Sequence, residues 1–130
     1  MPEANTGDAP AVPAATLDFS VIESLRRLGG RQESNLLGEL IDVFLVDART
    51  RVSNIERASR KEDPAALEAA AHGLKSSAAN LGLWRLSELC RQLERGGHTG
   101  RLEGARSKVE ELKQEYELAE KALMEIRDQI

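Results

Sequence analysis

Residues 71–94 read AHGLKSSAANLGLWRLSELCRQLE, and this stretch decides how the rest of the chain is interpreted. It places a histidine and a lysine among small residues, then turns at Gly82 into a segment with apolar residues at helical spacing. Two amphipathic segments joined at a glycine predict an antiparallel helical hairpin. The segments before and after it are then expected to supply the helices that cover its apolar side.

A helical wheel predicts that His72 lies outside the core. At about 100° per residue, the apolar residues before Gly82 gather on one side, with His72 almost opposite their centre. Lys75 and Glu68 share the face of His72, one turn away. The residues around the ring are small, whereas a solvated helix face normally carries long charged side chains. We therefore expect another surface to approach the imidazole closely.

The remaining periodic segments predict an all-α fold, an antiparallel four-helix bundle with an additional short N-terminal helix. Thr16 is expected to cap the first helix, and Gly29-Gly30 to end it. Asp63-Pro64 is a start signal, with a capping carboxylate before a proline at the first helical position. The predicted helices cover about residues 17–28, 33–60, 64–81, 83–95 and 102–128, with residues 96–100, GGHTG, as a loop.

The last helix has the most regular apolar pattern of the chain. Its apolar residues recur three and four apart, which is the seam of a left-handed helix bundle. They are Leu102, Ala105, Val109, Leu112, Tyr116, Ala119, Leu123 and Ile126. An intermolecular coiled coil would use the same pattern, but the other helices of the chain need covering, which favours packing within one molecule.

Composition bounds the class of protein. The 130 residues predict a single domain at 16–130, preceded by a proline-containing tail at 1–15 that is expected to be disordered. Hydrophobic residues make up 41% and aromatic residues 3%, which suits packed helices better than a sheet. A net charge of -4 argues against nucleic acid or an acidic membrane surface as the main partner. A lone cysteine and no long apolar run predict a soluble, cytoplasmic protein.

The chemistry that suits His72 is phosphoryl transfer through the ring. A neutral imidazole is a good nucleophile, and its other nitrogen has to be held in one tautomer, for which Glu94 on the next helix is a candidate. Lys75 can place an ammonium near an anion on the ring. Gly73 inside a helix costs about 0.5–1 kcal/mol relative to alanine, which hints at a steric reason. No phosphate-binding loop, nucleotide site or acidic magnesium cluster is present in the sequence, so a partner is expected to supply the metal and the catalytic groups.

Residues 72–82, HGLKSSAANLG, followed by Leu86, Cys90 and Leu93-Glu94, closely resemble the histidine-containing phosphotransfer (HPt) domain family. The family motif has the form H-x-x-K-small-S-x-x-x-x-G, with Leu, Cys and Leu-Glu on the following helix. The motif fixes residue types on two helices and is therefore specific. The surrounding helical pattern extends the resemblance over about residues 17–128.

The resemblance implies a phosphoryl carrier rather than an enzyme. It implies transfer between aspartates of response-regulator receiver domains in a multistep phosphorelay fed by a hybrid sensor histidine kinase, with magnesium on the receiver and no cofactor of its own. His72 would be the phosphoacceptor and Lys75 would help neutralise the phosphate. Ser76, often glycine in the family, would leave room for the receiver, and Glu94 falls where the family often has a Glu or Gln that bonds the ring.

The expected receiver-binding surface includes Leu36, Glu68, Ala69, Lys75, Ser76 and Ala79. The rival hypothesis is a helical adaptor that binds a signalling partner without chemistry. A metal-dependent or hydrolytic enzyme is disfavoured, because the two histidines and the carboxylates do not form a ligand set or a catalytic pair. A monomer is the default expectation, and Met1 with its polar tail mildly favours a free-standing protein over a fragment of a hybrid kinase.

Other candidate residues are interpreted as structural. His98 is expected to be a solvated loop residue without a partner, and Cys90 a buried thiol between helices. Trp84 is expected to be an exposed apolar contact for a partner beside the histidine, since its neighbours already supply the inward stripe. The charged residues from Glu103 to Glu120 are expected to be the solvated face of the last helix.

Overall fold

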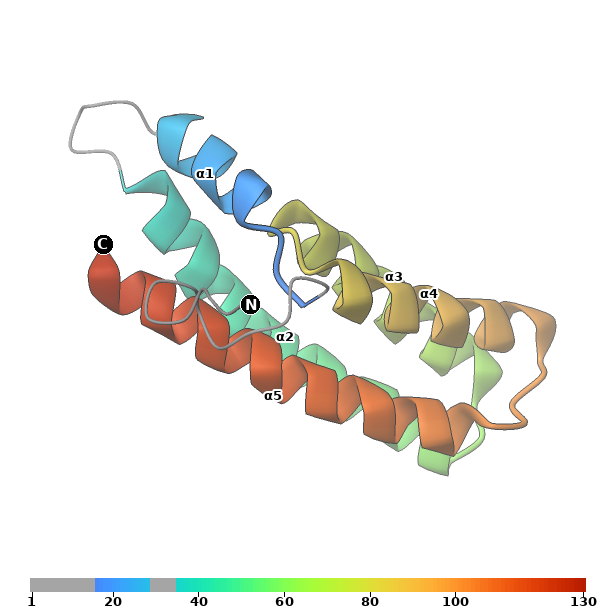
Figure 1. Ribbon diagram of the computed structural model, residues 1–130. Coiled ribbons are helices and arrows are strands. Elements are labelled where there is room, and N and C mark those ends of the chain that lie inside the picture. Colours follow the sequence, from blue (N-terminus) through green and yellow to red (C-terminus); the bar gives the residue numbers. More distant parts are fainter. Residues whose placement is uncertain (1–15, 29–34) are drawn as a thin grey trace, which may run out of the picture.

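Five helices account for most of the chain in the computed structural model, which describes residues 16–28 and 35–130 (Figure 1). No strand occurs within these ranges, which confirms the predicted all-α class. The predicted tail at residues 1–15 and the Gly29-Gly30 helix stop lie outside the described residues. The helices are α1 (Phe19–Leu28), α2 (Leu36–Arg60), α3 (Pro64–Asn80), α4 (Trp84–Thr99) and α5 (Ala105–Gln129).

The four longer helices form a bundle in which α2 and α5 make one layer and the α3–α4 hairpin makes the other (Figure 1). Helix α3 packs most extensively against α4, and contacts between α2 and α3 and between α4 and α5 close the bundle. Helix α1 packs against α2 near one end. The seam residues of α5 from Ala105 to Ile126 are buried inside this one chain, which is the intramolecular packing that we expected.

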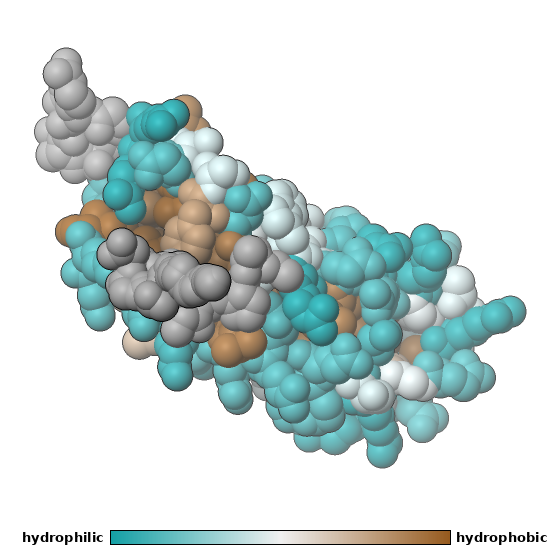
Figure 2. All heavy atoms as spheres, in the orientation of Figure 1, coloured by the Kyte–Doolittle hydropathy of each residue, from teal (hydrophilic) through white to brown (hydrophobic). Residues whose placement is uncertain are grey.

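The core consists mainly of leucine, isoleucine and alanine. Its largest fully buried apolar side chains are Leu17, Ile41, Ile55, Leu67, Leu74, Leu83, Leu86, Leu112 and Leu123. Figure 2 shows hydrophilic side chains over most of the visible face of α4 and α5, with apolar ones gathered near α1. No helix of the described ranges is long and apolar enough to cross a membrane.

Helix α3 begins where the sequence predicted. The Asp63 side chain accepts a hydrogen bond from the backbone nitrogen of Ala66 at 3.1 Å, and Pro64 occupies the first turn. Helix α2 begins at Leu36 rather than near residue 33, because the Asn35 side chain caps it by accepting from Gly38 N at 3.3 Å. A short polar side chain before the first turn thus sets the start of both α2 and α3.

The predicted N-terminal cap of α1 was wrong. The helix begins at Phe19, and the Asp18 carboxylate accepts from Ser20 N at 2.9 Å, whereas Thr16 is buried ahead of the helix. Leu17 fills the core from the segment before α1, and within the helix only Ile22 is buried. Leu28, at the end of the helix, is 73% exposed.

The predicted loop at residues 96–100 was also wrong. Helix α4 continues through Thr99 and ends at Gly100, whose φ of 76° is left-handed. A Cβ on Gly97 would lie 2.6 Å from the backbone oxygen of Pro64, so this glycine lets α4 approach the start of α3. Leu102, expected at the start of the last helix, lies in the connection, because α5 begins only after the left-handed Gly104.

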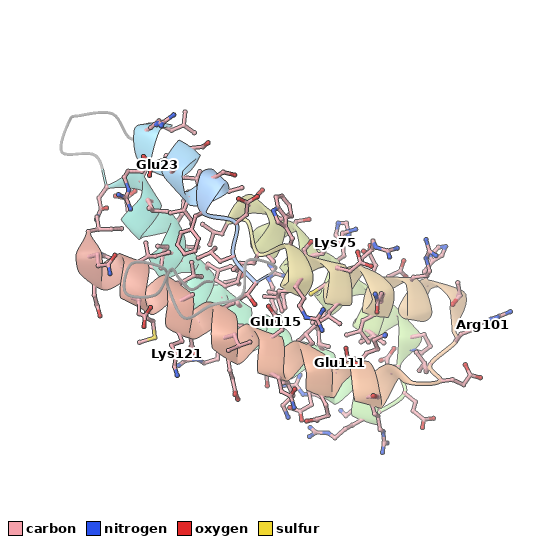
Figure 3. All side chains as sticks on the ribbon, viewed as in Figure 1. Glu23, Lys75, Arg101, Glu111, Glu115 and Lys121 are labelled. Carbon is pink, nitrogen blue, oxygen red and sulfur yellow. The ribbon has the colours of Figure 1, made fainter. Side chains whose placement is uncertain are left out.

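One member of the charged run on α5 departs from the expected solvated face. Glu115 is buried and points from α5 toward the α3–α4 layer (Figure 3). Its Oε1 lies 3.4 Å from Nε of Arg85 on α4. A carboxylate at this position is tolerated because a cation of the neighbouring helix reaches it.

Candidate functional site

His72 lies on the exposed face of α3, as the wheel predicted, with 62% of its side chain accessible. The ring nitrogen Nδ1 is 2.8 Å from Oε2 of Glu94 on α4. With Glu94 ionised, Nδ1–H donates to the carboxylate and the lone pair of the neutral ring belongs to Nε2. The antiparallel α3–α4 hairpin therefore favours the tautomer in which the outer nitrogen, Nε2, carries the free lone pair.

Lys75 completes the arrangement from the next turn of α3. Its Nζ lies 2.7 Å from Oε1 of Glu94, so that one carboxylate holds His72 with one oxygen and Lys75 with the other. The Lys75 ammonium lowers the pKa of Glu94, burial of the carboxylate opposes this, and the bond from His72 lowers the pKa further. Glu94 is thus kept as an anion, which it has to be in order to orient a Nδ1–H tautomer.

Hydrogen bonds from two serine side chains also hold the backbone beside the site. Ser87 Oγ on α4 donates to the backbone oxygen of Lys75 at 3.1 Å, and Ser77 Oγ donates to the backbone oxygen of Gly73 at 3.2 Å. Ser76 makes no such bond to any described residue, and it is exposed one turn after His72. The four expected site residues are therefore brought together on the α3–α4 layer, on the side away from α5 where Figure 3 shows Lys75.

Sequence reasoning missed Arg51 on α2. A Cβ on Gly73 would collide with Nη1 of Arg51 and would lie 2.7 Å from its Cζ, so the guanidinium packs directly on the glycine next to His72. Asp47, one turn earlier on α2, accepts a hydrogen bond from Nε of Arg51 at 2.6 Å. The unexplained glycine in a helix was the signal, but the sequence did not tell which side chain fills the space.

His98 is not the unpartnered loop residue that we predicted. It belongs to α4, and its Nδ1 lies 3.0 Å from Oε2 of Glu68 on α3, one turn from the His72–Glu94 pair on each helix. His98 reaches Glu68 because α4 continues past Gly97. Its side chain is 74% exposed, so the expectation of solvation is confirmed while the expectation of no partner is not.

Cys90 lies where it was expected, whereas Trp84 meets its expectation only in part. Cys90 is fully buried, and desolvation raises the pKa of its thiol to about 12. Trp84 is 47% exposed, but its indole Nε1 donates to Asp18 Oδ2 at 2.9 Å, which fastens the segment before α1 to the start of α4. It precedes Glu94 by about 15 Å along the helix axis, so it does not flank His72. No group of three or more potential metal ligands occurs among the described residues.

These features define a class of protein, a helical bundle that exposes a histidine held by a carboxylate, which is itself paired with a lysine. The chain belongs to the Hpt domain family, whose pattern matches residues 39–122, well over half of the sequence. It is accordingly a phosphotransfer protein of phosphorelays, and its partners are two-component signalling proteins.

A solved structure supports the same fold. The chain is similar to histidine-containing phosphotransfer protein B from Pseudomonas aeruginosa, with a TM-score of 0.83 and 25% sequence identity. The similarity covers 91% of this chain and 99% of the other. A search of curated proteins found no match.

Proposed function

We propose that His72 receives a phosphoryl group on Nε2 from the phosphoaspartate of one receiver domain and passes it to the aspartate of another. The observation that carries this proposal is the Glu94 carboxylate, which lies 2.8 Å from Nδ1 of His72 and 2.7 Å from Nζ of Lys75. It leaves Nε2 outward on a surface of small residues, where a second protein has access.

The transfer is a displacement at phosphorus. The Nε2 lone pair of His72 forms a bond to phosphorus while the bond from phosphorus to the aspartate oxygen breaks, and the aspartate leaves as a carboxylate. The phosphorylated ring keeps its proton on Nδ1 and carries a positive charge, which the Glu94 carboxylate stabilises. The onward transfer reverses these steps toward the second aspartate, and Lys75 partly neutralises the phosphoryl oxygens.

The remaining catalytic parts belong to the partner. In this proposal the receiver supplies magnesium and the groups that act on the leaving carboxylate, a hybrid sensor histidine kinase supplies the phosphoryl group, and Ser76 leaves room for the receiver beside the ring. The chain acts as a monomer, because the four-helix core is complete within one molecule. We place it in the cytoplasm together with these partners.

The proposal is tested by labelling. Receiver domains phosphorylated by a small phosphodonor are mixed with the wild-type chain, and acid-labile, base-stable label on the chain is measured. We expect His72→Gln to abolish the label and His98→Gln to retain it, although both residues have a carboxylate partner. Undiminished label in His72→Gln would refute the assignment, and no label with any receiver would favour the adaptor hypothesis instead.

A further inference from the structure

Two grooves run end to end between α2 and α3. The first, of about 140 Å³, lies along the first half of α2 and is lined by four apolar residues together with Asp47, Ser77 and Asn80. The second, of about 510 Å³, lies toward the α2–α3 turn and is rich in cations. The Asp47–Arg51 ion pair separates them, since Asp47 lines the first and Arg51 the second. We call the second one the basic groove; it is lined by Arg51, Asn54, Arg57, Ala58, Lys61, Asp63, Ala66, Ala69 and Ala70.

The basic groove begins beside the phosphoacceptor. Arg51 lies on Gly73, the residue that follows His72, and Ala69 is on the preceding turn of α3. Apart from its capping residue Asp63, α3 lines the groove only with Ala66, Ala69 and Ala70, so no long side chain of α3 covers the cations of α2 within it. Because Arg51 reaches Gly73, a protein bound over His72 needs to extend only along α2 to meet the groove.

The charge of the groove is not balanced from within. It contains three cations, of which Arg51 is paired with Asp47, and one carboxylate, Asp63, which already accepts the helix-capping bond from Ala66. Arg57 donates only to the neutral side chain of Asn54 at 3.2 Å, and neither Arg57 nor Lys61 has an ion pair among the described residues. The whole chain carries a net charge of -4, so this positive surface runs against its overall charge.

The groove on the other flank of His72 differs in this respect. It lies between α3 and α4, has a volume of about 350 Å³, and also contains cations. There, however, Lys75 is paired with Glu94 at 2.7 Å, and Nε of Arg91 is paired with Glu88 at 2.9 Å. A partner would have to break an existing ion pair in order to use Lys75 or Arg91, and only Arg95 of this groove has none within the described residues. In the basic groove, both Arg57 and Lys61 can be reached without breaking one.

We propose that the basic groove binds an acidic segment of the receiver domain and so selects which receivers dock over His72. This inference rests on the proposed function. An acidic segment would complement Arg57 and Lys61 directly, while apolar contacts of the same partner fit the exposed Val43 and Val46 farther along α2, which are 66% and 76% exposed. Complementary charge at the edge of an interface chiefly raises the rate of encounter and excludes partners of the wrong charge.

The test reverses charge at the end of the groove farthest from His72. Phosphotransfer is measured with the receiver domain that labels the wild-type chain fastest, over a range of receiver concentrations and at low and high salt. We expect Arg57→Glu/Lys61→Glu to raise the half-saturating receiver concentration by about tenfold or more at low salt, with the maximal rate changed less than about twofold. High salt should reduce the difference, because the interaction is between exposed charges.

The matched control reverses two charges on the other flank, Arg91→Glu/Arg95→Glu, and we expect less than about a threefold change there. Circular dichroism and thermal unfolding establish that both variants fold. Equal effects from both flanks, or an unchanged half-saturating concentration in Arg57→Glu/Lys61→Glu, would overturn the inference while labelling of His72 continues. Absence of label on the wild-type chain would instead overturn the proposed function, and this inference with it.

Discussion

At the scale of single residues, the site depends on one carboxylate that serves two cations. Glu94 holds the histidine ring with Oε2 and the Lys75 ammonium with Oε1. In the proposed function, Glu94 would set the tautomer of His72 before phosphorylation and stabilise the charged ring afterwards. Lys75, fixed by the same carboxylate, stays close to the ring instead of sampling solvent.

We expect Glu94→Ala to slow phosphotransfer by about tenfold, which corresponds to about 1.4 kcal/mol in the barrier. Glu94→Gln should fall between wild type and alanine, because its amide oxygen can still accept from Nδ1 but it cannot pair with Lys75. Single-turnover transfer from a phosphorylated receiver measures both rates. The control is Glu88→Ala, which removes an exposed carboxylate of the same helix that pairs with Arg91, and a comparable loss there would contradict the role given to Glu94.

At the scale of helices, two interior glycines fill opposite roles. Gly73 of α3 makes room for the end of a flexible arginine of α2, whereas Gly97 of α4 faces the backbone of α3. The guanidinium of Arg51 can swing away at little cost. The backbone at Pro64 and Glu68 cannot move without separating the hairpin that aligns Glu94 with His72.

Replacing each of these glycines by alanine should therefore change the free energy of unfolding in opposite directions. We expect Gly73→Ala to leave the free energy of unfolding unchanged or raise it by up to about 1 kcal/mol, because alanine is the better helix former. Gly97→Ala should lower it by about 1–3 kcal/mol, since a Cβ 2.6 Å from Pro64 O and 2.7 Å from Glu68 N overpacks the contact. Urea unfolding of the two variants measures this difference, and a destabilised Gly73→Ala would show that Arg51 is held rigidly.

The helical pattern was sufficient to predict the bundle and the exposure of His72, because burial on a helix repeats every three to four residues. The Asp63-Pro64 pair likewise predicted the residue at which α3 begins. The end of α4 could not be predicted, since Gly97 looks like a helix breaker until Pro64 of another helix is placed against it. Arg51 was missed for the same reason: its contact with Gly73 joins two helices and leaves no periodic signal.

At the scale of the whole molecule, the two layers of the bundle have different roles. Ion pairs between α2 and α5, such as Arg127 with Asp42 and Lys113 with Glu56, both at 2.9 Å, fasten the supporting layer. The other layer carries the site. It also contains Cys90, a fully buried thiol on α4, one turn before Glu94. Burial raises the pKa of its thiol to about 12, and the negative charge of Glu94 raises it in the same direction.

This raised pKa makes stability fall in alkaline solution. The unfolded thiol loses its proton near its ordinary pKa of about 8.5, while the folded thiol keeps it, so the unfolded state binds fewer protons between about pH 8.5 and 12. The free energy of unfolding should therefore be fully retained below about pH 8.5, and Cys90 should remove up to about 1.4 kcal/mol per pH unit above it.

We expect Cys90→Ala to be less stable than wild type by about 1 kcal/mol at neutral pH, because a small cavity replaces the sulfur. The gap should narrow or reverse by about pH 10.5, since alanine has no proton to lose. Urea unfolding at both pH values measures the two slopes. Tyr116, whose pKa burial also raises, contributes equally to both proteins, so the difference isolates the thiol. Parallel pH profiles for the two proteins would mean that Cys90 titrates in the folded state much as it does in the unfolded chain.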